Sequence, residues 1–136
     1  MGIETSDVTF RTWQHSSSPI PLPEPRNFDV GRPVIQGLQH DPDEPIFRTV
    51  GQAATISMIV KGEKNIKVTM FEERFDDNNK KRELGVMTLR CGDAGFTVSI
   101  NCRTPDTYKL IFEATNSRGT AIAYVYLMVH GRNDGG

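Results

Sequence analysis

The chain has 136 residues, of which 24% are charged, and its formal net charge is −1 at pH 7. This length provides one core of ordinary size, and the near-neutral charge argues against a surface that binds nucleic acid by neutralising phosphates. No apolar run approaches the roughly 20 residues needed to cross a bilayer, so we expect no membrane insertion, and we see no secretory signal at the N-terminus.

Residues 1–31 are rich in serine and proline and contain little that can pack into a core. Four prolines alternate with other residues over positions 19–25, which favours an extended polyproline II conformation without backbone donors. We therefore expect residues 1–31 to be an extended arm or linker. Within them, residues 7–13 alternate as a strand does and fit either the end of a preceding domain or a docking arm.

Short alternating segments fill the chain from residue 32 onward. Between Ala54 and Val60, apolar residues occupy every second position, which is typical of a strand buried on one face. Gly62 ends that run, and a second alternating strand starts at Ile66. We expect these two strands to lie across one core from each other. The other expected strands are residues 33–35 and 46–50 at sheet edges, 84–91, 96–100, 108–115 and 121–129.

Turn residues separate these strands. The polar stretch 72–83 predicts a hairpin, the GDAG sequence at 92–95 joins two strands, and residues 116–119 form a strong turn signal. No helical period of 3.6 extends beyond one turn. Seven or more short strands at this spacing predict an all-β domain, a sandwich or barrel, over residues 32–131, with a flexible tail at 132–136.

Two runs of residues have a spacing that a known family shares. The first contains Gly51, Ala54, Ile56, Met58, Val60 and Gly62. The second extends from Asp106 to Gly119 and includes Leu110, Phe112, Ala114 and Asn116. Together they resemble the intermediate set of the immunoglobulin superfamily over about 100 residues, the length that such a domain needs. The resemblance implies a two-sheet antiparallel immunoglobulin-like β-sandwich with an extended N-terminal arm.

The chain departs from this family at the family's most characteristic residues. Met58 and Phe112 stand where the family has the two cysteines of its inter-sheet disulfide, and Met70 stands at its core tryptophan. Leu110 replaces the corner tyrosine, and Tyr108 replaces a glycine. Because the replacements at the disulfide and tryptophan positions are large and apolar, we expect a filled core without the disulfide. In it, Met58, Met70 and Phe112 should lie in or near contact.

The two cysteines, Cys91 and Cys102, are expected to be free, buried and inert. In a hairpin that places Cys91 opposite Phe96, Cys102 lies opposite Gly85, and the two thiols are on the order of 20 Å apart. A disulfide requires Cα atoms within about 7 Å, so these cysteines cannot pair in that register. Free buried thiols indicate a reducing compartment, so we expect a cytoplasmic protein, with an extracellular location as the alternative.

We expect no catalytic site, no metal site and no cofactor. The three histidines, His15, His40 and His130, are scattered, and the two cysteines lack the spacing of zinc ligands. The acidic clusters at 41–44 and 76–77 lack the ligand spacing and turn glycine of a calcium loop. The chain is therefore predicted not to be an enzyme.

The resemblance implies a non-catalytic protein-interaction or structural module, one domain of a larger intracellular protein of cytoskeletal or muscle type. Its partners would be other proteins or neighbouring domains of the same chain. Candidate protein-binding residues are Trp13 and Leu22 in the arm, and Tyr124 and Tyr126 on one face of the last strand, a natural edge. The alternatives are an extracellular adhesion or recognition domain of immunoglobulin or fibronectin type, and an accessory β-sandwich of an enzyme.

Overall fold

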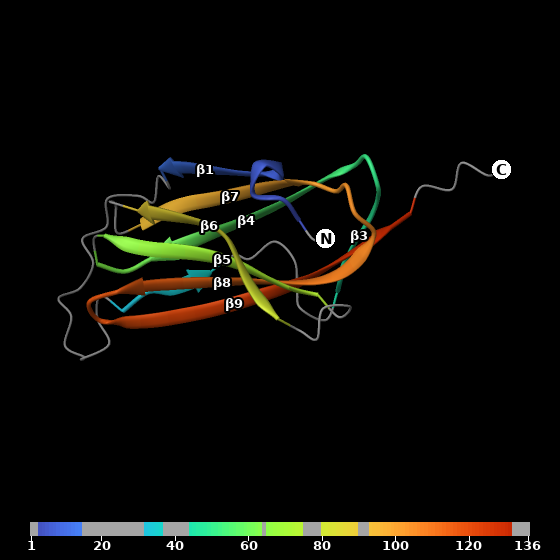
Figure 1. Ribbon diagram of the computed structural model, residues 1–136. Coiled ribbons are helices and arrows are strands. Elements are labelled where there is room, and N and C mark those ends of the chain that lie inside the picture. The colour runs from blue at the N-terminus through green and yellow to red at the C-terminus, as the bar shows by residue number, and fades with distance from the viewer. Residues whose placement is uncertain are drawn as a thin grey trace.

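A computed structural model describes residues 3–14, 32–36, 44–63, 65–74, 80–89 and 93–131. These residues form two β-sheets that pack face to face around one apolar core (Figure 1). The prediction of an all-β, two-sheet sandwich is confirmed. Within the described ranges, no helix is long and apolar enough to cross a membrane.

The first sheet has four strands and is antiparallel throughout. Its strands lie in the order β1 (Val8–Gln14), β7 (Asp93–Asn101), β4 (Ala53–Lys61) and β2 (Val34–Gln36). The alternating run in β4 faces the core as predicted, since Ala54, Ile56, Met58 and Val60 are all buried. The short strand expected near residue 34 is β2, and it lies at the edge of this sheet.

The second sheet has five strands, in the order β3 (Ile46–Thr49), β9 (Gly119–His130), β8 (Asp106–Asn116), β5 (Ile66–Arg74) and β6 (Lys81–Leu89). The neighbours are antiparallel, as predicted, except β3 and β9, which pair in parallel. Both strands end at the same end of the sandwich, where the N–H of Val50 donates to the carbonyl oxygen of His130. There Gly51, with φ of 99°, helps turn the chain from β3 into β4.

Met58, Met70 and Phe112 are fully buried at the centre of the sandwich, which confirms the predicted core. Met70 lies opposite Phe112 in the β5–β8 pair, and Met58 lies opposite Phe96 in the β4–β7 pair. The rings of Phe96 and Phe112 meet edge to face across the two sheets, with centroids 6.4 Å apart. Aromatic side chains therefore fill the space between the sheets.

The hairpin expected between residues 84–91 and 96–100 is wrong. β6 pairs with β5, whereas β7 pairs with β1 and β4, so the chain crosses from one sheet to the other between them. Local alternation is the same in both arrangements, because each strand buries one face against the same core. Because this hairpin does not form, the predicted register that placed Cys102 opposite Gly85 is also wrong. Cys102 is buried and free as predicted, and Cys91 lies outside the described residues.

The first strand of the chain belongs to the sandwich. β1 pairs with β7 from Val8 opposite Ile100 to Gln14 opposite Ala94. The prediction that residues 1–31 form an arm outside the domain is thus corrected for residues 3–14, whereas 15–31 and the tail 132–136 lie outside the described residues. The physical reason is an edge of β7: β4 pairs with one side of β7, and β1 supplies the backbone partners for its other side.

Phe10 anchors β1 to both sheets. Its ring lies 5.4 Å from the ring of Phe96, and it also stands directly over Gly85 of β6. A Cβ atom at Gly85 would overlap the Phe10 ring. The absence of a side chain at this position therefore makes room for the aromatic anchor of β1.

A buried carboxylate holds the start of the chain. Glu72 is 1% exposed, and its Oε2 accepts a hydrogen bond of 3.0 Å from the backbone N–H of Ile3. Arg82 donates to Oε1 of Glu72 and also to the carbonyl oxygen of Ile3. A buried carboxylate is stable only with such donors. We call Ile3, Glu72 and Arg82 the N-terminal latch.

Replacing Gly85 with alanine is expected to destabilise the fold by about 1–3 kcal/mol, because the new methyl group must displace the Phe10 ring. Chemical denaturation of a double-mutant cycle with Phe10→Ala measures this coupling. In the Phe10→Ala background, the same Gly85→Ala change should cost much less. Equal costs in both backgrounds would show that Phe10 does not occupy this position.

Candidate protein-binding face

The outward face of the five-stranded sheet carries a row of apolar side chains. Along β9, alternate residues such as Val125 and Leu127 are buried, so the residues between them point away from the core. Phe47 of β3 lies opposite Met128 and therefore points to the same side. We call this surface the β9–β3 face and define it by Ile122, Tyr124, Tyr126, Met128 and Phe47.

Three of the five side chains of this face are exposed, whereas Tyr126 and Met128 are half-buried. The exposed fractions are 64% for Ile122, 56% for Phe47 and 37% for Tyr124. The rings of Tyr124 and Tyr126 meet edge to face at 5.7 Å, and Phe47 stacks on His130 at 6.1 Å. Single exposed apolar residues are common, but an aligned group of them is typical of a surface that another molecule covers.

Charged side chains of the neighbouring strand β8 border the apolar row, and one of them pairs with a lysine of β6. Lys109 of β8 holds its Nζ atom 4.5 Å from the centre of the Tyr124 ring. Lys81 of β6 lies over Phe71 at 4.1 Å and forms an ion pair with Glu113 of β8. Cations above ring faces are attracted by the ring electrons, so these lysines remain close to the sheet.

The structure brings together two of the four residues predicted from sequence. Tyr124 and Tyr126 lie side by side on the β9–β3 face. Trp13 belongs to β1, at the far edge of the other sheet, where its backbone pairs with Gly95. Leu22 lies outside the described residues.

The prediction that β9 is a free edge is wrong for part of its length. Its last four residues, from Leu127 to His130, pair with β3. Sequence reasoning missed Phe47, because its place depends on this parallel pairing. It also missed Ile122, although the alternation with Tyr124 would have indicated it.

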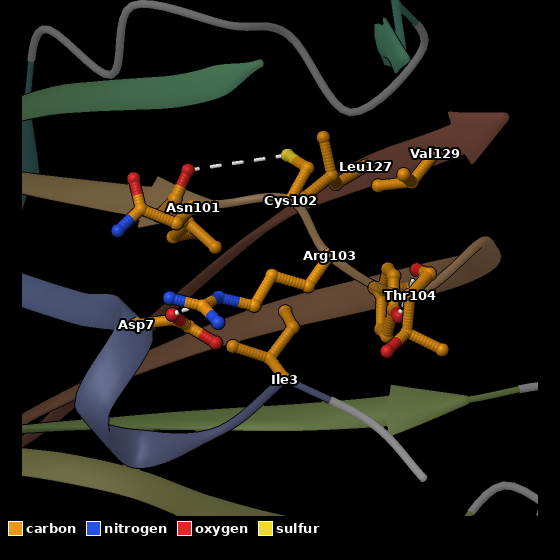
Figure 2. Close-up of a pocket in the computed structure, with 10 residues that line it drawn as sticks. Ile3, Asp7, Asn101, Cys102, Arg103, Thr104, Leu127 and Val129 are labelled. Carbon is orange, nitrogen blue, oxygen red and sulfur yellow. Dashed lines mark hydrogen bonds and ion pairs between the residues drawn. The ribbon is translucent and has the colours of Figure 1, made fainter. Parts of the chain in front are cut away.

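A small pocket lies at the end of the sandwich, where the connection between β7 and β8 meets the start of the chain (Figure 2). Asp7 and Arg103 face each other in it, with 2.7 Å between Oδ1 and Nε. Ile3 of the N-terminal latch lines another wall of the pocket. Among the described residues, no group of three potential metal ligands occurs here or elsewhere. The ion pair between Asp7 and Arg103 attaches the N-terminal segment to the connection between β7 and β8.

Tyr108 also lines this pocket. Its hydroxyl donates a 2.6 Å hydrogen bond to the carbonyl oxygen of Thr104, four residues upstream. This is the bond of a tyrosine corner, made two residues before the position where the family resemblance placed it. Burial, and then the charges of Asp106 and Glu72, raise the pKa of Tyr108, so the hydroxyl stays protonated.

Cys102 also borders the pocket. Burial raises the pKa of its thiol, although the nearby Arg48 charge acts in the opposite direction. The reactive thiolate is therefore disfavoured at neutral pH. Burial of Cys102 is confirmed, and its inertness stays a prediction.

No family model and no curated protein sequence matches this chain. Among solved structures, it is similar to a chain of a mutant titin M10–obscurin-like 1 Ig complex. That chain is 18% identical, the match covers 74% of this chain and 94% of that chain, and the TM-score is 0.50. It is also similar to a chain in a structure on T cell activation by toxic shock syndrome toxin-1, with 10% identity, 71% and 98% coverage, and a TM-score of 0.52. These likenesses show the immunoglobulin-like fold alone.

Proposed function

We infer that this protein is a non-catalytic protein-interaction module of intermediate-set type, which binds a protein partner through the β9–β3 face. The observation that carries this inference is the alignment of Ile122, Tyr124 and Phe47 on one exposed surface. Burying apolar area contributes about 25 cal/mol per Å², so a partner that covers these side chains gains affinity.

The composition of the face supports a protein ligand. Tyrosine and phenylalanine are enriched in protein interfaces, where they act as rigid anchors. Lys109, Lys81 and Glu113 border the apolar row as the polar rim of an interface does. Rim charges add specificity and orientation more than affinity.

The cellular setting is part of the same proposal. A free, buried Cys102 fits a reducing compartment, so we assign the protein to the cytoplasm. The similar chain from the titin M10–obscurin-like 1 complex comes from a structure in which such proteins bind one another. This supports a domain of a larger cytoskeletal or muscle-type protein, with neighbouring domains or other proteins as partners.

Photocrosslinking tests the proposal. A benzophenone amino acid at position 124 should capture a partner in an extract of the source cells, and Ile122→Asp should abolish capture. The matched control carries the same group at position 55, where Thr55 is exposed on the other sheet. Capture that is equal from both positions, or unaffected by Ile122→Asp, would show that the face is not the binding surface.

A further inference from the structure

We propose that the open edge of β9 pairs with the same edge of a second copy of this chain. The two β9 strands run antiparallel about a two-fold axis that passes through Ile122 at right angles to the sheet. The two five-stranded sheets then form one continuous sheet. This inference goes beyond the proposed function and does not rest on it, because it uses the backbone edge of β9 rather than the outward face.

β9 has an open edge over most of its length. β8 pairs with one side of β9 from Gly119 to Val129, whereas β3 pairs with the other side only from Leu127 onward. Within the part of the chain that the structure describes, no strand pairs with that side between Gly119 and Tyr126. The sequence of this stretch, GTAIAYVY, contains no charged residue and no proline. The other edge strands are protected, since β2 and β3 are short and β1 and β6 contain charged residues, so this stretch is the edge that offers a template to another strand.

The backbone groups that face the open side follow from a neighbouring hydrogen bond. The carbonyl oxygen of His130 accepts from the N–H of Val50, so the N–H and C=O of His130 point toward the β3 side of β9. The β8–β9 register has no shift, so every second residue of β9 points the same way as His130. Thr120, Ile122 and Tyr124 therefore present both backbone groups to the open side.

A two-fold axis through Ile122 pairs all of these groups. Ile122 lies opposite Ile122 of the second copy, and Thr120 lies opposite Tyr124 of the second copy. Because each such pair exchanges two hydrogen bonds, both backbone groups of all three residues find a partner. The same strand supplies both halves of the contact, as an isologous interface requires.

The position of β3 selects this axis. β3 begins at Ile46, which pairs with Leu127, so β3 of the second copy closes the far end of the open stretch. With the proposed axis, Leu127 of the second copy lies at the level of Ser117, before the first residue of β9, and its β3 does not meet β9. An axis one residue further along β9 would place Leu127 opposite Gly119, where Ile46 and β9 would occupy the same space. An axis one residue earlier would leave Tyr124 with no β9 residue opposite it.

The side chains suit the same register. Between the hydrogen-bonded pairs, Ala121 lies opposite Ala123 of the second copy in the closer type of pair, with Cα atoms about 4.5 Å apart. Two methyl groups fit this short separation on the inner side of the sheet. On the outer side, Ile122 meets Ile122 of the second copy. At 64%, it is the most exposed large apolar side chain among the described residues, so the axis lies where the most apolar surface is left to bury.

Sedimentation equilibrium of the full chain tests the second copy. Wild-type protein should show a reversible equilibrium between monomer and dimer. Ile122→Lys should weaken self-association about tenfold or more, because two like charges meet on the axis. Val86→Lys is the matched control, since Val86 is exposed on β6 at the opposite edge of the same sheet, and it should leave the dimer unchanged. A wild-type chain that is monomeric up to its solubility limit, or equal effects of the two variants, would overturn the proposal.

Disulfide trapping tests the axis with two small substitutions. A full chain with Ala121→Cys is mixed with a full chain with Ala123→Cys in a glutathione redox buffer, and a disulfide should join the two chains. Either variant alone should form little covalent dimer, because equivalent residues of the two copies lie about 8 Å apart, beyond the roughly 7 Å that a disulfide spans. The wild-type chain is the control for the native cysteines. A mixture that forms no more covalent dimer than the single variants would overturn the pairing of β9 with β9.

Discussion

Replacing Phe112 with alanine is expected to lower the free energy of unfolding by about 3–5 kcal/mol. Phe112 is fully buried, lies opposite Met70, and meets the ring of Phe96 across the two sheets. The smaller side chain removes these contacts and leaves a cavity that a two-sheet core cannot close. A loss of this size is a large part of the stability of a single domain. Urea or guanidinium denaturation measures it directly.

Ile122→Ala is the matched control for the core substitution. Ile122 is 64% exposed, so its truncation should change the free energy of unfolding by no more than about 0.5 kcal/mol. The contrast between the two positions tests which face of the five-stranded sheet is the core. A Phe112→Ala protein as stable as Ile122→Ala would contradict the arrangement of the two sheets.

Removing residues 1–14 is expected to lower the stability by about 3–5 kcal/mol. The truncated chain loses the burial of Ile3 and the packing of Phe10, and a buried apolar side chain contributes about 1.5–3 kcal/mol. The buried carboxylate of Glu72 loses the N–H of Ile3, and β7 loses its pairing along one edge. Thermal and denaturant unfolding of the truncated and full chains measure the difference.

Two single substitutions separate the contribution of Phe10 to stability from that of the rest of β1. Phe10→Ala should reproduce much of the effect of the deletion, whereas Arg11→Ala, at an exposed neighbouring position of β1, should be near neutral. If the deletion changes neither the unfolding midpoint nor the cooperativity, then residues 3–14 are a linker and do not belong to the sandwich.

Much of the core could be predicted from the sequence, because burial on one face leaves a local pattern. The alternation through β4 and β5 identified Met58 and Met70 as inward residues, and the motif in β8 identified Phe112. The alternation needs only the positions within one strand, whereas Phe112 followed from the family resemblance. The turn between β8 and β9 was equally visible, because Asn116 and Gly119 flank it.

The pairing of distant segments could not be predicted in the same way. β1 alternates like any half-buried strand, but nothing in residues 8–14 identifies β7 as the strand with which it pairs. The crossing between β6 and β7 has the same difficulty, since a hairpin and a crossover share one alternation pattern. Glu72 lies in a run of charged residues that suggested a solvated hairpin, and its burial depends on distant partners, the N–H of Ile3 and the guanidinium of Arg82.

The residues of the candidate site also fall into two groups: those that share one strand, and those that strand pairing brings together. Tyr124 and Tyr126 share a strand, so their common face followed from alternation alone. Phe47 joins them only because β3 pairs with β9 in parallel, and Lys109 reaches Tyr124 only because β8 lies beside β9. A binding surface built from several strands depends on their order in the sheet, which a single sequence does not display.

Binding through the β9–β3 face is tested most directly by NMR of the isotope-labelled full chain, as the unlabelled partner is added. That partner is a protein captured from position 124. We expect the largest changes in amide signals at Ile122, Tyr124 and Tyr126, with little change at Thr55 and Ser99 on the outward face of the other sheet. Changes concentrated at Thr55 and Ser99, with the β9–β3 face unaffected, would contradict the proposed binding surface.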